Sequence, residues 1–312
     1  MTFKKRLIIL LSMIAVLALT YTVSIIVSAG LGETSSYAWL DSRSASRANK
    51  ITVNAEGNEF ELVKRSNQWF VLHDGLEFPA RQMRVEDFLT IFTTKSSWPV
   101  RSSGTSSHER FGIGQGAGNV AIYSDNNKLL DLLVGYDDVF RNETYFRKAH
   151  LNEVRSGSIT IKTYITNAVN NWYNLRLISE TESGNMDIDV IQKLTVNMPH
   201  ETQVFARRNR GWEISGINVE NPSRNSIEGY IRGILNMEGD SFEDSVSRTD
   251  PIFDQINMVL EFGNGRIVTI RYSEPDENGR CFAHVSGKEY IYSIPAWSAN
   301  RLYRTASSFE MQ

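Results

Sequence analysis

Residues 51–70, ITVNAEGNEFELVKRSNQWF, decide how this chain is built, because residues 194–213, LTVNMPHETQVFARRNRGWE, follow the same pattern. The tryptophans near the ends of the two stretches, Trp69 and Trp212, lie 143 positions apart. This shared arrangement predicts two copies of one domain in tandem.

The spacing of 143 positions extends beyond the tryptophans. It also separates Ile51 from Leu194 and Pro79 from Pro222. Because the spacing stays constant from Ile51 to Pro79, we expect the first half of each copy to derive from one ancestral segment.

Apolar residues alternate with polar ones at the start of the first copy, at Ile51, Val53, Phe60 and Leu62. A period of two residues predicts strands with one buried face, and short connections between them predict an antiparallel sheet.

A helix is predicted after each opening group of strands. Its apolar residues recur at i, i+3, i+4 and i+7, which places them on one helix face. They are Val85, Phe88, Leu89 and Phe92 in the first copy and Ile227, Tyr230, Ile231 and Ile234 in the second. Asn225 lies three residues before Glu228 and predicts a capping box for the second helix.

Further strand patterns follow each helix, and a short helical pattern with a tryptophan, Trp172 or Trp297, closes each copy. The predicted fold class is therefore α+β, with two tandem copies of a mainly antiparallel β domain. Each copy has one amphipathic helix and one closing helix. We place the repeat domains at residues 51–180 and 186–312.

An apolar run of about 23 residues, from Leu7 to Ala29, follows the basic cluster Lys4-Lys5-Arg6. As a helix it would measure ~34 Å, enough to cross a hydrocarbon core of ~30 Å. We therefore expect residues 1–30 to form an N-terminal transmembrane helix, with a cleaved signal peptide as the alternative. Residues 31–50 are then a juxtamembrane linker. The positive-inside rule predicts a cytoplasmic N-terminus and an extracytoplasmic main chain.

The composition argues against several classes of protein. A net charge of −3 over 312 residues offers no broad basic surface for nucleic acid. Cys281 is the single cysteine, which excludes a disulfide within the chain and a cysteine-based zinc site.

These motifs resemble the domain of unknown function (DUF) 4340 family of bacterial proteins. The family pattern is a strand pair that ends in tryptophan, then a proline, a helix with Val-Glu-Asp, and a Phe-Gly element. The first copy supplies Trp69, Pro79, Val85-Glu86-Asp87 and Phe111-Gly112-Ile113, and ends on Trp172-Tyr173-Asn174-Leu175. The second copy keeps Trp212, Pro222 and Ile227-Glu228 and lacks the Phe-Gly element.

The resemblance implies an accessory role at the bacterial inner membrane. Members of the family typically follow one N-terminal membrane helix and are often encoded beside ABC-type exporters such as those of gliding motility. The implied partners are therefore the membrane, an ABC-type permease and auxiliary subunits. The resemblance carries over no catalytic residue.

No motif for chemistry meets its full pattern in this sequence. The glycines from Gly112 to Gly118 precede a strand pattern, whereas a phosphate loop needs a helix there. Asn185, Asp187 and Asp189 begin like a calcium loop, but Val190 and Val196 stand where glycine and glutamate are required.

Single side chains also favour ordinary structural roles. We read Asp137-Asp138 as turn carboxylates and Cys281 as a buried thiol. The histidines, His73, His108, His150, His200 and His284, lack the spacing of metal ligands. We therefore predict no catalytic residue, cofactor or metal.

One charged run remains as a candidate interaction site. Arg207, Arg208 and Arg210 surround Asn209 just before Trp212, and could bind phosphate or an acidic partner. The alternative is a plain hairpin tip. The residues that mark the repeat are Trp69, Pro79, Phe88, Trp172, Trp212, Pro222, Tyr230 and Trp297.

The predicted function is that of a membrane-anchored, extracytoplasmic accessory protein that binds protein or glycan in an ABC-type export or gliding-motility-like complex. Two alternatives stay open. One is a cell-envelope hydrolase with its site between the two copies, and the other is a stand-alone structural or solute-binding envelope protein.

Overall fold

The computed structural model describes residues 13–23, 36–158, 160–178, 188–209, 211–302 and 304–311. The chain divides into two compact units. Unit 1 comprises Met1–Leu76 and Arg84–Val169, and unit 2 comprises Glu77–Met83 and Asn170–Gln312.

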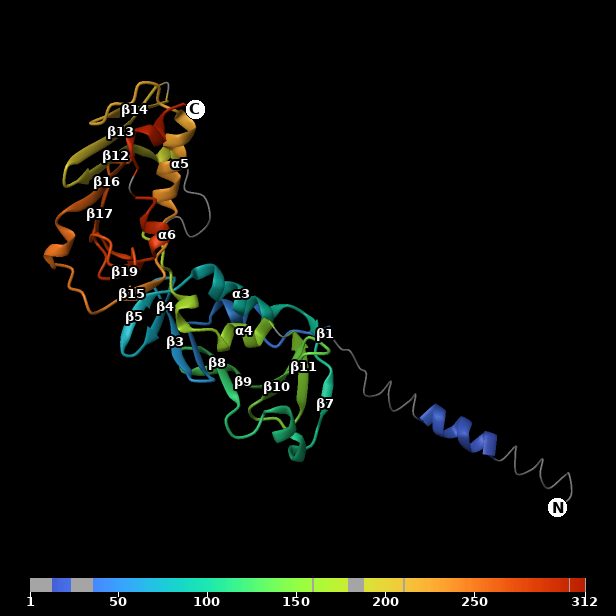
Figure 1. Ribbon diagram of the computed structural model, residues 1–312. Helices are drawn as coiled ribbons and strands as arrows, with labels where there is room; N and C mark the ends of the chain where they lie inside the picture. Colours follow the sequence, from blue (N-terminus) through green and yellow to red (C-terminus); the bar gives the residue numbers. More distant parts are fainter. Residues whose placement is uncertain are drawn as a thin grey trace, which may run out of the picture. The chain divides into compact units, whose positions relative to one another are not determined.

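Unit 1 holds all strands but β5 of a mainly antiparallel sheet of nine strands, in the order β5-β4-β3-β2-β8-β9-β10-β11-β7, and most of β5 falls in unit 2. Its helices α3 (Gln82–Thr93) and α4 (Thr160–Thr166) accompany the sheet (Figure 1). The strands are β2 (Lys50–Ala55), β3 (Asn58–Arg65), β4 (Gln68–His73), β5 (Leu76–Pro79), β7 (Val100–Ser102), β8 (Gly118–Ser124), β9 (Asn127–Asp138), β10 (Glu143–Lys148) and β11 (Val154–Ser158). Short 3-10 turns are η1 (Thr105–Ser107) and η2 (Glu109–Phe111).

Unit 2 contains an eight-stranded sheet in the order β14-β13-β12-β16-β17-β18-β19-β15. Helix α5 (Arg224–Leu235) lies along this sheet, and β14 ends it on one side (Figure 1). The strands are β12 (Ile191–Met198), β13 (Glu201–Arg208), β14 (Gly211–Ser215), β15 (Ser241–Glu243), β16 (Ile256–Phe262), β17 (Ile267–Tyr272), β18 (Cys281–Val285) and β19 (Ile291–Ile294). The remaining elements are α6 (Ala296–Ala299), η3 (Val169–Trp172), η5 (Ile188–Val190), η6 (Pro251–Phe253) and η7 (Ala306–Phe309).

The two sheets share one strand order. The series β4-β3-β2-β8-β9-β10-β11-β7 in unit 1 corresponds strand for strand to β14-β13-β12-β16-β17-β18-β19-β15 in unit 2. The register agrees as well, because Ile51 faces Leu62 as Leu194 faces Phe205. Strand β5 is the one strand of the larger sheet without a counterpart in this series.

The alternating pattern explains this register. Ile51, Val53, Leu194 and Val196 are all buried, and a slip of one residue would turn each of them to the opposite face. The predicted helix stripes are also found. Val85, Phe88 and Phe92 of α3 are buried, as are all four stripe residues of α5.

The start of α5 differs from the prediction. Its N-cap is Ser223, whose side chain accepts a hydrogen bond from the backbone N–H of Ser226. The predicted cap, Asn225, already lies inside the helix. Glu228 instead forms an ion pair with Arg224, at a distance of 2.7 Å. A serine at the cap satisfies a backbone donor in the first turn that has no partner within the helix.

The predicted N-terminal transmembrane helix is wrong for the part of the chain that the structure describes. There, no helix is both long enough and apolar enough to cross a membrane. Residues 13–23 form a helix, and the remainder of the predicted span, at 1–12 and from residue 24 onward, lies outside the described residues. Over the described residues, the fold therefore consists of three mainly antiparallel sheets and short helices.

The predicted juxtamembrane linker is also corrected over residues 36–50, which belong to the folded unit 1. Strand β1 (Ser36–Tyr37) pairs with β6 (Ser96–Ser97) to form the third, two-stranded sheet, and α2 spans Ser42–Ser46. Trp39 and Leu40 are buried. The Trp39 ring packs edge-on against the Trp98 ring, with 5.3 Å between the ring centroids. The buried side chains of Trp39 and Leu40 therefore attach this segment to unit 1, although most of its residues are polar.

The predicted match between Trp172 and Trp297 as closing residues is corrected too. Trp172 is fully buried in η3, whereas Trp297 of α6 is 63% exposed. Trp172 corresponds to Phe309 in η7 by its contacts. The carbonyl of Trp172 accepts a hydrogen bond from Arg81 N–H, and that of Phe309 accepts one from Ser223 N–H. Both donors lie just before a helix.

Candidate interaction surface

An open hollow of about 770 Å³ lies on unit 2 beside the β13–β14 hairpin. Its walls come from β12, from the hairpin and from the first turns of α5. The lining residues are Gln192, Arg207, Arg208, Asn209, Gly211, Trp212, Arg224 and Glu228. The hollow therefore gathers two of the three arginines predicted as an interaction site, whereas Arg210 lies outside the described residues.

The local sequence explains why these side chains meet. Arg208 pairs with Gly211 across the hairpin, so only two residues make the turn. Gly211 has a φ of +142°, a value that side chains rarely allow, and this lets the chain reverse tightly. The tight turn brings Arg207 and Arg208 of β13 beside Trp212 of β14, and α5 brings Arg224 to the same hollow.

Each arginine of the hollow has a carboxylate partner. Arg207 pairs with Asp189 of η5, and its guanidinium also lies over the Trp212 ring. Arg208 Nε lies 2.9 Å from a Glu213 oxygen, and Arg224 Nε lies 2.7 Å from a Glu228 oxygen.

Exposure separates the three arginines. The side chains of Arg208 and Arg224 are 68% and 66% exposed, whereas that of Arg207 is 27% exposed. Arg207 therefore holds the hairpin against η5, and among the described residues of the hollow Arg208 and Arg224 are the cations that a partner can reach. The Glu228 carboxylate raises the pKa of Arg224 further, so this guanidinium stays charged throughout the working pH range.

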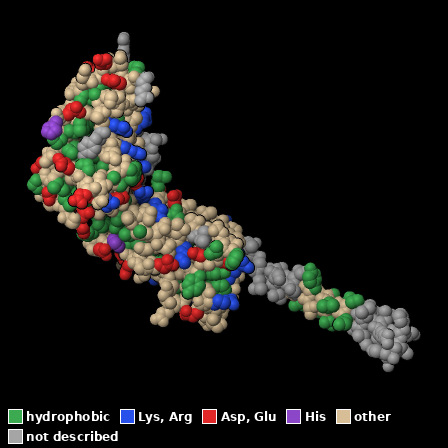
Figure 2. Space-filling model, viewed as in Figure 1, with side chains coloured by type: hydrophobic (Ala, Val, Ile, Leu, Met, Phe, Trp, Pro, Cys, Tyr) green, Lys and Arg blue, Asp and Glu red, His purple; other side chains and the backbone are tan. Residues whose placement is uncertain are grey.

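Figure 2 shows acidic and basic side chains interspersed over the face in view. Binding at the hollow would therefore depend on short-range contacts to individual guanidinium groups, since salt at physiological strength screens exposed charges beyond about 8–10 Å.

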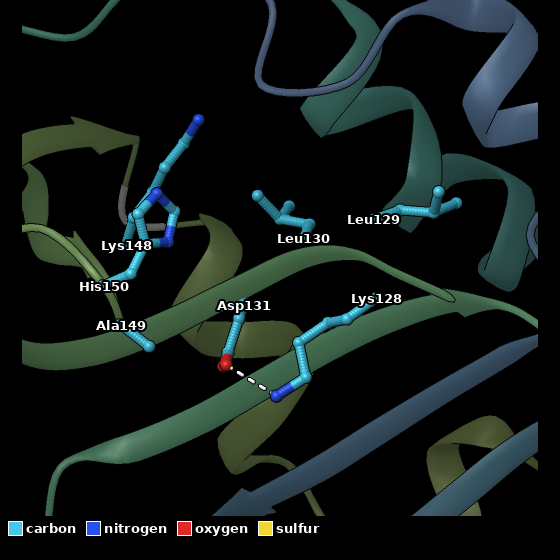
Figure 3. Close-up of a pocket in the computed structure, with 7 residues that line it drawn as sticks. All are labelled: Lys128, Leu129, Leu130, Asp131, Lys148, Ala149 and His150. Carbon is cyan, nitrogen blue, oxygen red and sulfur yellow. Dashed lines mark hydrogen bonds and ion pairs between the residues drawn. The ribbon is translucent and has the colours of Figure 1, made fainter. Parts of the chain in front are cut away.

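A second open hollow of about 420 Å³ lies on unit 1, between β9 and the chain after β10 (Figure 3). Lys128 and Asp131 stand on one side of it and Lys148 and His150 on the other. Lys128 Nζ lies 2.7 Å from Asp131, which also accepts a hydrogen bond from Asn119 at 2.9 Å.

The chemistry of this second hollow is limited by that pair. Although burial alone would raise the pKa of the Asp131 carboxyl, the hydrogen bonds from Lys128 and Asn119 hold the pKa below its ordinary value. An ionised carboxylate that already accepts two hydrogen bonds is a poor general base. Lys148 is also engaged, because its ammonium lies over the Trp39 ring at 5.4 Å.

The five histidines are dispersed over the structure. His108 contacts the Asn152 carbonyl at 2.9 Å, and His73 lies beside Asp74 in the β4–β5 turn. His284 lies on β18 and His200 is exposed in a turn. Among the residues that the structure describes, no group of three His, Cys, Asp or Glu side chains could hold a metal ion.

Cys281 and Asp137-Asp138 are held by their surroundings. Cys281 is fully buried on β18, and burial raises the pKa of its thiol to about 12. Asp137 accepts a hydrogen bond from Thr144, and Asp138 accepts one from Tyr145 that lowers the pKa of its carboxyl. These carboxylates fasten β9 to β10 near the register shift between the two strands.

The glycine-dense stretch has a packing role at Gly112. Its φ is +67°, and a Cβ there would come within 2.7 Å of the Tyr136 ring. Gly118 begins strand β8, as the sequence predicts. Of the three residues that resemble a calcium loop, Asn185 and Asp187 lie outside the described residues, and Asp189 is the partner of Arg207.

The repeat markers occupy structural positions. Trp69, Phe88, Trp172 and Tyr230 are buried, and the Tyr230 hydroxyl donates a hydrogen bond to the Leu302 carbonyl at 3.0 Å. Trp212 is half-buried and lines the hollow. Pro79 is the last residue of β5, shortly before α3, and Pro222 lies shortly before α5. The Pro79 carbonyl accepts a hydrogen bond from Asn174, and Pro222 forms a β-bridge with Glu310.

Sequence reasoning missed Arg224, Glu228 and Gln192 as members of the hollow. Arg224 and Glu228 stand four positions apart, which is the spacing of a helical ion pair. That signal was present in the sequence, but nothing in it placed the start of α5 beside a hairpin tip.

Comparisons with known proteins give little support for any family. No family model and no curated protein matches the chain. One solved structure with some likeness is described as a "Putative DNA polymerase III beta subunit" from Eubacterium rectale, with 9% sequence identity and a TM-score of 0.17. The alignment covers 83% of this chain and 59% of that one, and a TM-score of this size carries no inference about fold or function.

Proposed function

We propose that this protein is a non-catalytic accessory component of an ABC-type export or gliding-motility-like complex. It acts by binding a protein partner through the arginine-bordered hollow of unit 2. The sequence resemblance to the DUF 4340 family supports the kind of complex, and that resemblance stays a prediction.

The observation that carries the contact role is the placement of Arg208 and Arg224. Both side chains are about two-thirds exposed and both border one hollow, although they come from different elements. Arginine and tryptophan are enriched at protein interfaces, and here Trp212 lines the same hollow. Guanidinium groups favour a partner with carboxylates over a neutral glycan, because the planar fork matches a carboxylate.

Co-purification tests this proposal. The full chain, tagged at its C-terminus in its native cells, should recover a permease or an auxiliary subunit under mild extraction. The double variant Arg208→Glu/Arg224→Glu should lose that recovery, whereas Arg65→Glu, at the equivalent position of unit 1, should retain it. Recovery of the protein alone from every fraction, or equal recovery by all three chains, overturns the proposal.

A further inference from the structure

The outer edge of β14 is the open end of the unit 2 sheet. Among the described residues, β14 pairs with β13 on one side and with no strand on the other. In unit 1 the corresponding strand β4 is followed by β5, which extends that sheet by a ninth strand. One repeat of the fold therefore fills a position that the other leaves open.

The sequence after each strand explains the difference. Asp74 and Gly75 have φ values of +49° and +76°, which is the backbone of a tight two-residue turn that sends the chain back along β4. After β14 stands Gly216, with a φ of +87°. A Cβ there would lie 1.8 Å from the Thr202 carbonyl oxygen, so the chain passes close against β13 instead of returning along β14.

An open strand edge offers unpaired backbone donors and acceptors to another extended chain. Peptide recognition by strand addition uses this backbone pairing for affinity and nearby side chains for specificity. Strand β14 has five residues, from Gly211 to Ser215, which suits a short added strand.

The side chains beside this edge define the chemistry of the incoming strand. Arg208 and Arg224 border the adjoining hollow and are the reachable cations there. Their ion pairs with Glu213 and Glu228 engage Nε, and a guanidinium carries five N–H donors, so each can bind a second carboxylate. Exchange of an exposed carboxylate such as Glu213 costs little, since water solvates both charges well when an exposed ion pair separates.

We propose that the β14 edge binds an extended acidic segment of a protein partner as an additional strand, with its carboxylates on Arg208. This inference rests on the proposed contact role and names the class of partner. Alternate residues of a strand point to one face, so an acidic residue at every second position would present a row of carboxylates on the face that Arg208 shares with Glu213.

The test uses the full chain and a synthetic peptide of about ten residues in which Asp and Val alternate. Hydrogen exchange followed by mass spectrometry reports protection over residues 211–215. The Asp-Val peptide should protect this segment. A Lys-Val peptide should not, because of its charge, and an Asp-Pro peptide should not, because proline cannot donate the backbone hydrogen bonds.

Two variants sharpen the test. Arg208→Glu should lower the affinity for the Asp-Val peptide roughly tenfold, in the range measured for charge pairs at interfaces. Glu213→Gln should raise this affinity roughly threefold, because the substitution removes the carboxylate that pairs with Arg208. Arg65→Glu in unit 1 is the matched control and should leave binding unchanged. Circular dichroism confirms that each variant is folded.

The outcomes separate this inference from the proposed complex. Absence of protection over β14, equal protection by the Lys-Val or Asp-Pro peptide, or weaker binding by Glu213→Gln overturns the edge-strand inference. Protection of β14 by the Asp-Val peptide without recovery of a permease or auxiliary subunit supports the inference and overturns only the proposed complex.

Discussion

The guanidinium of Arg207 lies over the indole ring of Trp212, 6.0 Å from the ring centroid and directly opposite it in the β13–β14 register. Unit 1 repeats the relationship with Lys64 and Trp69, at 5.7 Å across β3 and β4. Each pair is thus a cross-strand contact of a cation with an aromatic ring, at the same point of the repeated fold.

Burial makes the two tryptophans unequal, and this gives the first prediction. Trp69 is 3% exposed, so Trp69→Ala should lower the free energy of unfolding of unit 1 by about 3–5 kcal/mol. Trp212 is half-buried, so Trp212→Ala should cost unit 2 about 1–2 kcal/mol. Urea unfolding of the full chain, followed by circular dichroism, measures both. A larger loss for Trp212→Ala would contradict the assigned burial.

The second prediction concerns the start of α5. Ser223→Ala removes the side chain that accepts the Ser226 N–H and should lower the stability of unit 2 by about 0.5–2 kcal/mol. Asn225→Ala is the matched control. Because Asn225 lies within the helix, its replacement by a stronger helix former should be neutral or slightly stabilising. The same urea titration measures both variants. A larger loss of stability for Asn225→Ala than for Ser223→Ala would identify Asn225 as the N-cap instead.

The first half of each repeat could be predicted because local pattern controls its register. Trp69 and Trp212 are 143 positions apart, and the hairpin pairs Lys64–Trp69 and Arg207–Trp212 keep this spacing in the structure. Alternating apolar residues and short turns are sufficient to align two strands.

The second half of each repeat could not be predicted in this way, because loop lengths change the spacing. Val120 on β8 corresponds to Met258 on β16, which is a separation of 138 positions. Phe309 therefore does not stand at the earlier spacing from Trp172. Residue type alone favours the exposed Trp297 as the counterpart, because burial cannot be read from the sequence.

The predictions for the N-terminal region failed for a related reason. Composition alone favoured a membrane helix and a polar linker, but Trp39 and Leu40 are buried in unit 1 by contacts with segments distant in sequence. The hollow could not be predicted for the same reason, because Arg208 and Arg224 come to line it only after the sheet and α5 have packed.

The third prediction tests why the chain does not return along β14. Gly216→Ala should destabilise unit 2 strongly, because the added Cβ would overlap the Thr202 carbonyl oxygen in addition to straining a φ of +87°. Gly265 is the matched control, since its φ is +83° and a Cβ there would meet no atom within 4 Å. Gly265→Ala should cost only the backbone strain, about 1–2 kcal/mol. Equal losses in urea unfolding would show that the close approach to Thr202 does not constrain the chain.

The fourth prediction concerns Cys281. Its side chain is fully buried, and burial raises the pKa of the thiol to about 12, so the reactive thiolate is scarce at pH 8. A disulfide reagent such as dithionitrobenzoate should label no thiol in the folded chain and one in urea. Rapid labelling of the native protein would contradict the buried position. Ser286→Cys in the exposed turn after β18 provides a reactive control.

The fifth prediction is a pH dependence at His284. Its Nε2 contacts the Lys288 carbonyl at 3.1 Å, and its Nδ1 lies 3.1 Å from Arg271, so the neutral ring fits both neighbours. Burial first, and then the charges of Arg271 and Arg248, lower the pKa of His284, although the Lys288 carbonyl opposes this. The folded state therefore binds this proton less readily than the unfolded chain, whose histidine pKa is about 6.5.

The sign follows from that difference. Above pH about 6.5 the neutral ring is present in both states and the stabilisation is complete. As the pH falls below this value, the unfolded chain takes up the proton first, so stability declines until the pH passes the lowered pKa of the folded state. His284→Gln should therefore show a shallower loss of unfolding free energy between pH 7.5 and 5 than the unaltered chain. His200→Gln, at an exposed turn, should leave the slope unchanged. Parallel slopes for all three proteins would mean that the Arg271–His284 contact does not couple to folding.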